Sequence, residues 1–394
     1  TTTMYNVAIG HVAGESITTG IQNTLIGALA GDALTDADYN VALGVTALSG
    51  DTKGSKSTAI GYSTLVNQNF TASTNTNNTA VGFEAGMSVT TGFQNTLIGA
   101  AAGDALTTGQ ENVALGYAAL SNDDVGNHSV AIGWNALISQ NYSTSTDSNN
   151  VAVGWNSGSA ITTGLNNTFV GSHAGDGTDD GGNNVAVGYQ ALSANCGNSN
   201  TAVGYQALAV CTGSDNTCVG LLAGSNVTSG SNNLFLGHDA GITGSPGGNF
   251  AAASNEIVLG DENITDFNCQ VSLTVASDQR DKTDFTALDL GMNFVKALKP
   301  YTFKWDKRSK YIDKTDPSVD LNKVTTDGTH KEDQLDVGFK AQDVVALEEA
   351  SNYKISDKTN LTVNLSSDGK QYAMRYEKLV PILVKAIQEL EARV

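Results

Sequence analysis

The fold is decided by a five-residue unit that appears as NVAIG at residues 6–10, NTLIG at 23–27 and NVALG at 40–44. Each unit is Asn-x-x-x-Gly with small or branched apolar residues between, and most steps between units are 17 residues long. Asn6 and Asn78 begin equivalent units 72 residues apart, which indicates duplication of a four-unit block. Counting three variant units that begin with Ser or Glu, there are fifteen, which begin at Asn6, Asn23, Asn40, Ser57, Asn78, Asn95, Asn112, Ser129, Asn150, Asn167, Asn184, Asn200, Asn216, Asn233 and Glu256.

Such a unit is too short for a strand-helix-strand motif, and the sequence around it lacks helical periodicity. It predicts one coil of a parallel β-roll or β-solenoid, in which coils stack about 4.8 Å apart. Glycine permits the tight corners, and stacked Asn side chains can form a hydrogen-bonded ladder. Small residues leave a thin core for one roll, so we expect copies to associate side by side. The predicted fold class is mainly β.

Charge divides the chain into two parts. Residues 1–276 contain only two of the 21 basic residues, Lys53 and Lys56, but half of the 40 acidic ones. Their formal charge is therefore about −18, whereas residues 277–394 are close to neutral. A surface this acidic excludes nucleic acid and anionic membranes as partners of the first part. The sequence also lacks an apolar run long enough to span a membrane.

The repeats resemble the head repeats of trimeric autotransporter adhesins and of some phage tail fibres, which are parallel β-rolls in a trimer. The C-terminal part is similar to the endosialidase-type intramolecular chaperone domain of phage tail fibres and tailspikes. Four motifs occur in the order of that family, and they are SDQRDK from Ser277, KPYTFKW from Lys299, VGFKAQDV from Val337 and YEKLVPILVKAIQELEARV from Tyr376. The expected domains are a repeat shaft at 1–260, a connector at 261–276 and a small α+β chaperone domain at 277–394.

The chaperone resemblance implies a homotrimer whose C-terminal domain guides folding and then cuts the chain between Ala276 and Ser277. Ser277 would be the nucleophile and Lys282 its base, which needs burial or nearby charge to become neutral. Asp278 and Arg280 would position them. Because Ser277 would attack the peptide bond that precedes it in the same chain, the protein would be a single-turnover serine peptidase at most. The alternative is that SDQRDK is a charged turn without chemistry.

The last predicted helix carries an apolar stripe with the 4-3 spacing of a coiled-coil seam. Its residues are Tyr376, Val380, Leu383, Ile387, Leu390 and Val394. We interpret the stripe as a seam between copies. The alternative is that it packs on the core of its own domain.

Further candidate sites depend on position in the coils. Exposed aromatic rings beside Asn and Thr suit stacking on sugars. The candidate receptor contacts are therefore Phe70, Trp134, Tyr142 and Trp155. Three aspartates recur at the 72-residue period and could gather cations in a trimer, although duplication explains them equally well, and they are Asp32, Asp104 and Asp176. Neither His11, His173 and His238 nor the four cysteines have metal-ligand spacing. No metal and no cofactor is predicted.

The leading functional interpretation is a phage tail fibre or tailspike shaft for host attachment. It would be made in the host cytoplasm, displayed on the virion, and joined to an upstream fibre or baseplate component, because the chain opens in phase with its repeats at Thr1. Its receptor would be a cell-surface glycan or another host molecule. One alternative is a cellular trimeric adhesin or surface appendage. A polysaccharide-degrading tailspike is a third class, but the array lacks an evident pair of catalytic carboxylates.

Overall fold

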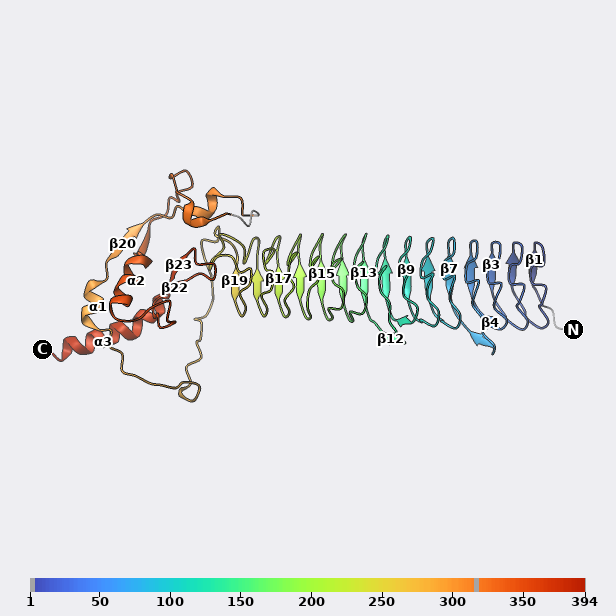
Figure 1. Cartoon of the computed structure of the whole chain (residues 1–394), viewed down its shortest axis with the longest axis horizontal. Coiled ribbons are helices and arrows are strands. Elements are labelled where there is room, and N and C mark those ends of the chain that lie inside the picture. The colour runs from blue at the N-terminus through green and yellow to red at the C-terminus, as the bar shows by residue number, and fades with distance from the viewer. Residues whose placement is uncertain (1–3, 315–318, 394) are drawn as a thin grey trace. The chain divides into compact units, whose positions relative to one another are not determined.

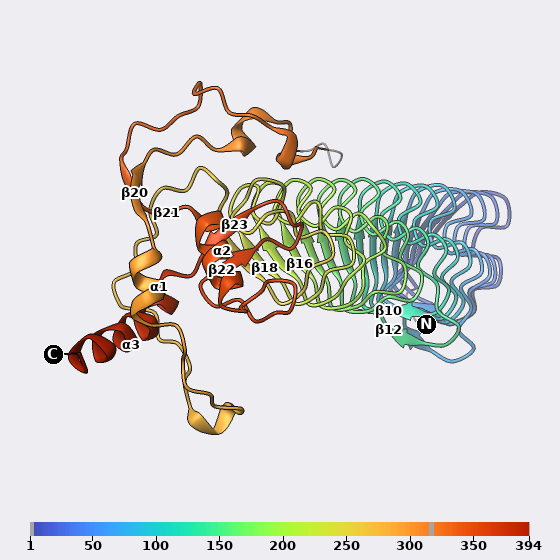
Figure 2. The ribbon, with the colours of Figure 1, turned by 60° about the vertical axis from the view of Figure 1, so that its left-hand side comes forward.

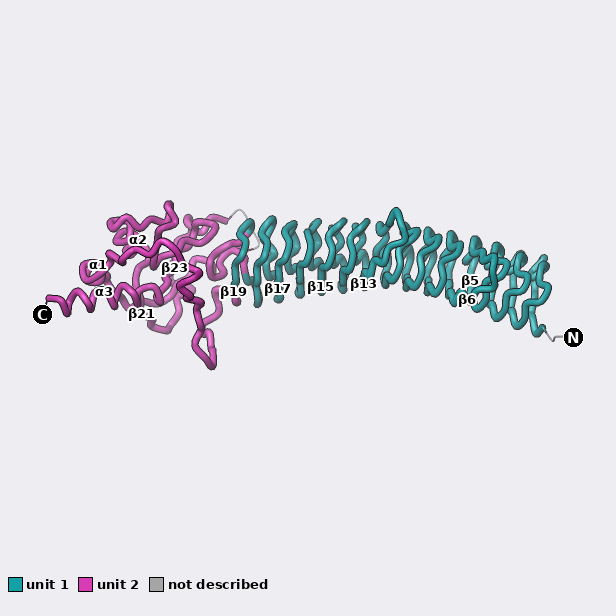
Figure 3. Tube along the Cα trace, turned by 90° about the horizontal axis from the view of Figure 1, so that it is seen from below, with its two compact units in different colours: residues 1–240, 251–257 teal, residues 241–250, 258–394 magenta. Residues whose placement is uncertain are grey.

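The computed structural model describes residues 4–314 and 319–393. It divides into two compact units, shown in Figure 3. The solenoid unit comprises residues 1–240 and 251–257, and the C-terminal unit comprises residues 241–250 and 258–394.

The repeat array folds as a parallel β-solenoid (Figures 1 and 2), which confirms the predicted fold class. One three-residue strand follows each of the fifteen unit-initial residues, and successive strands pair in parallel, for example Ala114 with Ala131. The strands of this sheet are β1 (Val7–Ile9), β2 (Thr24–Ile26), β3 (Val41–Leu43), β5 (Thr58–Ile60), β7 (Thr79–Val81), β8 (Thr96–Ile98), β9 (Val113–Leu115), β11 (Val130–Ile132), β13 (Val151–Val153), β14 (Thr168–Val170), β15 (Val185–Val187), β16 (Thr201–Val203), β17 (Thr217–Val219), β18 (Leu234–Leu236) and β19 (Ile257–Leu259).

From β2 onward the middle residue of each solenoid strand is buried, and in several coils its size is complementary to that of a corner residue of the same coil. Where the strand carries Ala114 or Ala131, the corner carries a buried leucine, Leu120 or Leu137. Where the strand carries Leu97, the corner is Gly103, because a Cβ there would overlap the Leu97 side chain. The narrow core is therefore filled by alternating large and small side chains between its two walls.

Glycine closes each strand because the coils approach one another too closely for a side chain. Gly116 has a φ of +141°, and a Cβ at this position would overlap the carbonyl oxygen of Gly133 in the next coil. The same geometry recurs from coil to coil, so the glycine of each unit is fixed both by its backbone conformation and by the stacking distance.

The predicted asparagine ladder is present, and it runs mainly between side chain and backbone. Asn112 is fully buried; its Nδ2 donates to the carbonyl of Gly126 at 2.8 Å, and its Oδ1 accepts from the amide of Ser129 at 2.9 Å. Each Asn thus satisfies two backbone groups of a corner where the sheet ladder cannot reach. Direct bonds between the side chains also occur, as from Asn216 to Asn200 at 3.1 Å.

Two coils replace the Asn by Ser and complete the ladder with a buried glutamine. Gln140 Nε2 donates to Ser129 Oγ at 2.7 Å and to Asp123 Oδ2 at 2.6 Å, while its Oε1 accepts from Asn150 at 2.9 Å. Gln68 makes the equivalent bonds one block earlier. The longer loops of these coils add two short parallel pairs, β4 (Gly54–Ser55) with β6 (Thr74–Asn75), and β10 (Gly126–Asn127) with β12 (Thr146–Asp147).

The C-terminal unit is an α+β domain. Its apolar core contains Leu290, Phe294, Val344, Val363, Leu379 and Ile382. The helices are α1 (Met292–Ala297), α2 (Ala341–Ala350) and α3 (Leu379–Glu391), the antiparallel pairs are β20 (Pro300–Phe303) with β21 (Asp336–Phe339) and β22 (Val363–Leu365) with β23 (Tyr372–Met374), and the 3-10 turns are η1 (Gln279–Asp281), η2 (Arg308–Tyr311), η3 (Leu321–Lys323) and η4 (Tyr376–Lys378).

Two buried or half-buried carboxylates join these elements. Glu389 of α3 accepts from the amide of Met292 at 2.8 Å and so caps α1. Glu348 of α2 accepts from the amides of Leu361 and Thr362, the two residues before β22. In the part of the chain that the structure describes, no helix is both long and apolar enough to cross a membrane.

Candidate self-cleavage site

The SDQRDK motif folds into a single tight turn that is built from its own residues. Asp278 caps η1, because its Oδ1 accepts from the amide of Arg280 at 2.9 Å. The amide of Lys282 then donates to the carbonyl of Gln279 at 3.2 Å. The turn reverses the chain, so the side chain of Lys282 comes back to the residue that begins the motif.

Ser277 and Lys282 are in direct contact. The Nζ of Lys282 lies 2.5 Å from the Oγ of Ser277 and 3.3 Å from the Ser277 carbonyl oxygen. This places a nucleophile and a base within hydrogen-bond reach, which is the geometry that a Ser-Lys pair needs. Ser277 also adjoins the carbonyl of Ala276 through its own amide, so the nucleophile and the bond to be cut are covalent neighbours.

Arg280 and Asp278 form the second pair of the turn. The guanidinium binds the carboxylate through two nitrogens, with Nε 3.1 Å from Oδ1 and Nη2 2.6 Å from Oδ2. Hydrogen bonds from Arg280 hold the pKa of the Asp278 carboxyl below its usual range, and the carboxylate in turn raises the pKa of Arg280. The predicted positioning residues therefore bond to one another and hold the turn, and among the described residues neither side chain forms a hydrogen bond to the side chain of Ser277 or Lys282.

All of these residues are exposed in the single chain. A lysine acts as a base only after losing its proton, and desolvation or nearby positive charge promotes that loss. The single chain thus supplies the geometry of the pair but leaves it in solvent.

Helix α3 has two apolar faces. Leu379, Ile382 and Ala386 are buried in the core of the unit, whereas the predicted seam lies on the adjoining face of the helix and is exposed. Its exposed fractions are 58% for Val380, 44% for Leu383, 64% for Ile387 and 52% for Leu390. The core of their own domain therefore leaves these four side chains largely uncovered in the single chain. A seam between copies stays a prediction.

The first and last residues of that stripe differ from the others. Tyr376 lies in η4, before α3 begins, and its ring stacks on Phe339 with centroids 6.1 Å apart. Val394 lies outside the described residues.

The four predicted receptor contacts divide into two pairs. Trp134 and Trp155 are exposed, at 44% and 50%, and their rings lie 5.8 Å apart. Phe70 and Tyr142 are buried, at 8% and 5%, which corrects the expectation that their rings face solvent. The long loops fold inward here, and the Tyr142 hydroxyl donates to the Gly164 carbonyl at 2.9 Å.

The two tryptophans belong to an outer aromatic ladder that sequence reasoning missed. Neighbouring rings contact from coil to coil through Tyr117, Trp134, Trp155, His173, Tyr189 and Tyr205. The signal was present in the recurring Gly-Tyr and Gly-Trp pairs, because the residue after the closing Gly points outward. Beside it runs an outer aliphatic column, the last residue of each strand from Ile9 to Leu236, every member of which is Ile, Leu or Val.

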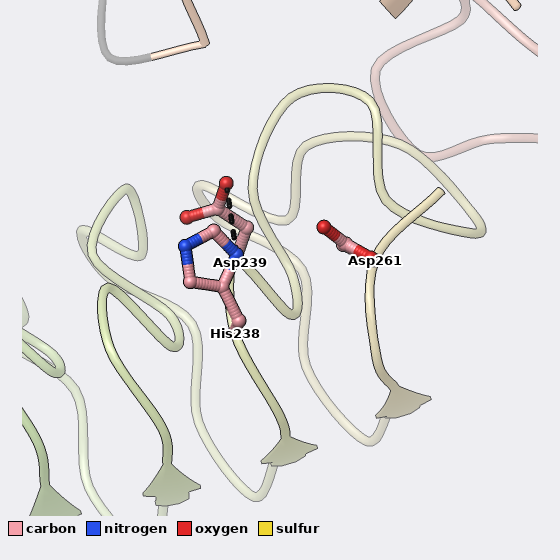
Figure 4. Close-up of side chains that lie close together, drawn as sticks. All are labelled: His238, Asp239 and Asp261. Carbon is pink, nitrogen blue, oxygen red and sulfur yellow. Dashed lines mark ion pairs between the residues drawn. The ribbon is translucent and has the colours of Figure 1, made fainter. Parts of the chain in front are cut away.

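The recurring aspartates do not form a cluster within the chain. Asp104 and Asp176 lie in different coils, and burial raises the pKa of each carboxyl. Each has one buried carboxylate oxygen without a hydrogen-bond partner among the described residues, as does Asp32. His173 pairs with Asp176 at 2.8 Å, and His238 pairs with its neighbour Asp239 at 3.4 Å (Figure 4).

The cysteines form no disulfide within the described residues. Cys196, Cys211 and Cys218 are buried in the solenoid unit, and burial raises the pKa of each thiol. Cys269 is exposed.

Comparison with protein families identifies the C-terminal part. Residues 277–351 match the family described as chaperone of endosialidase, and the match begins at the serine of the turn. No curated protein matches the chain. Residues 277–351, which follow the β-solenoid and its connector in the chain, are therefore similar to the endosialidase-chaperone family.

Proposed function

We propose that this protein is the shaft of a trimeric phage tail fibre or tailspike used for host attachment. Its C-terminal domain guides the assembly of three copies and then cuts the chain between Ala276 and Ser277. The observation that carries the cleavage step is the 2.5 Å contact between Lys282 Nζ and Ser277 Oγ at the start of the matched family domain.

The reaction follows from the position of Ser277. Lys282, once neutral, takes the hydroxyl proton as Oγ attacks the carbonyl carbon of Ala276. This attack forms the new C–O bond and a tetrahedral intermediate, whose C–N bond then breaks as Lys282 returns the proton to the amine of Ser277, and Ala276 is left as an ester on the Ser277 oxygen. Water hydrolyses this ester to the Ala276 carboxylate and the free Ser277 hydroxyl. The proximity of adjacent residues replaces the binding of a separate substrate.

Assembly supplies the desolvation that the single chain lacks. The turn is exposed, and a neutral lysine is favoured when water is removed or positive charge approaches. We therefore assign the role of closing the site to neighbouring copies, so that a chain is cut only after it has been assembled.

Two exposed apolar surfaces support association of copies. On the solenoid unit, the outer aliphatic column and the outer aromatic ladder run along the same side of the sheet through successive coils. On the C-terminal unit, the seam face of α3 is apolar and exposed. Contiguous apolar surfaces of this size mark interfaces on proteins that stay in solution.

Host attachment belongs to the solenoid unit under this proposal. Trp134 and Trp155 are the exposed pair among the predicted receptor contacts, and exposed aromatic faces suit the apolar faces of sugars. An acidic shaft also avoids nonspecific binding to anionic surfaces.

The proposal is tested on the full chain and on Ser277→Ala, Lys282→Ala and Lys282→Arg variants. Mass spectrometry of the wild type should give two fragments that meet at Ala276 and Ser277, while the three variants should stay intact. Lys282→Arg keeps the charge but cannot release a proton, so its failure to cleave would separate base catalysis from simple positioning. Light scattering should give a trimer for all four proteins. An intact wild-type trimer would refute self-cleavage, and a monomeric or dimeric shaft would refute the assembly.

A further inference from the structure

The segment before the proposed cleavage bond has the sequence of a β-strand but no strand partner. From Cys269 to Val275, apolar residues alternate with Gln, Ser and Thr, which is the pattern of a strand with one buried face. Yet Val271, Leu273 and Val275 are 76%, 79% and 77% exposed. Figure 1 shows this stretch as an extended trace between β19 and α1.

Its backbone is also unpaired. No hydrogen bond involves residues 267–276 within the described parts of the chain, whereas the coils before them are bonded at nearly every corner. An extended segment with free amides and carbonyls and an apolar face is a template for pairing with another strand.

The charge pattern favours an identical partner. No charged residue lies between Asp266 and Asp278, although the sequence up to residue 276 is strongly acidic. When identical strands pair in register, each charge faces a like charge and destabilises the pair. Uncharged stretches also occur within the solenoid, but their strands are already paired there, so residues 267–277 are an uncharged stretch still open to pairing with copies of itself.

We propose that residues 268–276 become a β-strand only in the assembly, by pairing in parallel with the same segment of neighbouring copies. The face formed by Cys269, Val271, Leu273 and Val275 turns toward the shared axis, and Gln270, Ser272 and Thr274 turn outward. This inference rests on the homotrimer proposed above. After cleavage, the paired segment would remain as the C-terminal end of the shaft and hold the three chains together there.

Cysteine cross-linking in the full chain tests the inference. Cys269 is the exposed cysteine among four, so mild oxidation of the native protein reports on this position while the buried thiols stay protected. Disulfide-linked dimers should form on the axis, but because a threefold site leaves one thiol unpaired, at most about two thirds of the chains should be linked. Reduction should reverse the link.

Two matched variants test the strand itself. Both carry Cys269→Ser, and one adds Leu273→Cys on the inner face while the other adds Thr274→Cys on the outer face. We expect cross-linking at least tenfold faster for L273C than for T274C. Equal rates, or no cross-links at 269 and 273 in a chain that light scattering shows to be trimeric, would overturn this inference and leave the trimer standing. A monomer by light scattering would overturn both.

Discussion

The side chains of Ser277 and Lys282 are in contact because hydrogen bonds within the six residues of SDQRDK fix the turn between them. The cap from Asp278, the guanidinium of Arg280 and the closing bond from Lys282 all lie within the motif. A turn that depends on local bonds can form before the rest of the domain has folded. Under the proposed self-cleavage the Ser-Lys contact would carry the chemistry, while the exposed ion pair would only bias the turn.

Replacing Arg280 by Ala should slow self-cleavage without abolishing it. Solvent screens a fully exposed ion pair and leaves it a small contribution to the turn, so the rate should fall by no more than roughly tenfold. The measurement is the intact fraction over time after folding begins, compared with Ser277→Ala. Complete loss of cleavage in a correctly assembled Arg280→Ala trimer would mean that Arg280 acts on the reaction itself.

Among single residues, those contacts were predictable from the sequence that join residues close together in the chain. The turn and its Ser-Lys contact are local, and we expected the pair from the resemblance to the chaperone family, because the hexapeptide alone is equally a charged turn. The burial of Phe70 and Tyr142 was not predictable in the same way, because it depends on loops that fold over the solenoid core and reach Gly164 in the following coil. A lone aromatic in a polar insertion carries no local signal for that.

The coil is the repeating structural element of the solenoid. Both its thin apolar core and the buried hydrogen bonds of its Asn, Gln and Asp side chains stabilise it. Each ladder Asn forms hydrogen bonds to two backbone groups, a carbonyl at a corner and the amide of the first residue of the next unit, as Asn112 does with Gly126 and Ser129. In the Ser coils the polar column continues by other means: a buried Gln bonds to the Ser hydroxyl, to a buried Asp and to the side chain of the next ladder Asn.

Asn112→Ala should destabilise its region of the solenoid by about 2–5 kcal/mol, because it leaves the Gly126 carbonyl and the Ser129 amide buried without partners. Hydrogen exchange should accelerate most at the amide of Ser129 and in the adjoining coils. Asn122→Ala, at an exposed site, is the matched control and should leave exchange unchanged. Equal effects from the two variants would contradict the ladder's role.

Acid should stabilise the solenoid through its buried carboxyls. Burial raises the pKa of Asp123, so the folded chain holds that proton more tightly than the unfolded chain, whose value is about 3.9. Stability therefore falls as the pH rises through the window between the unfolded and the raised pKa, and it is higher below that window. Burial also raises the pKa of the Asp104 and Asp176 carboxyls.

Thermal unfolding of the full chain at about pH 4 and pH 7 measures this. The wild type should unfold at the higher temperature in acid, and Asp123→Asn should narrow the difference between the two conditions. Asp180→Asn, at an exposed site, should not. A solenoid that is less stable at pH 4 would show that the carboxyls outside the core dominate.

The coils were predictable because their period is short and strict. Each of the fifteen units marks a strand that begins at the next residue. The matching of strand and corner residues was not predicted, although both positions are visible in the sequence. It becomes apparent only when the fold shows that Leu97 and Gly103 face one another across the same core.

At the scale of the whole molecule, folding and final stability make different demands. Parallel coils join segments that are distant in the sequence, so they form slowly and expose strand edges meanwhile. Once stacked, each coil is held by its neighbours. A domain that brings three chains into register is therefore needed early and can be discarded later.

A chain that ends at Ala276 should give aggregated or monomeric protein when it is expressed alone. Removing residues 277–394 after assembly should instead leave a soluble trimer that unfolds very slowly. Light scattering and unfolding half-lives at elevated temperature measure the two cases. Unaided folding of the shortened chain to the same trimer would show that the C-terminal domain is dispensable for folding here.

The matched core also sets how such a protein can change length over evolutionary time. The core pairs repeat from one 72-residue block to the next: Phe169 and Gly175 stand where Leu97 and Gly103 stand in the block before. The end of one block therefore fits the start of any other block. Unequal recombination between gene copies can then insert or remove four coils at once. Each event would change the reach of the protein by about 19 Å while creating no new junction that selection must repair.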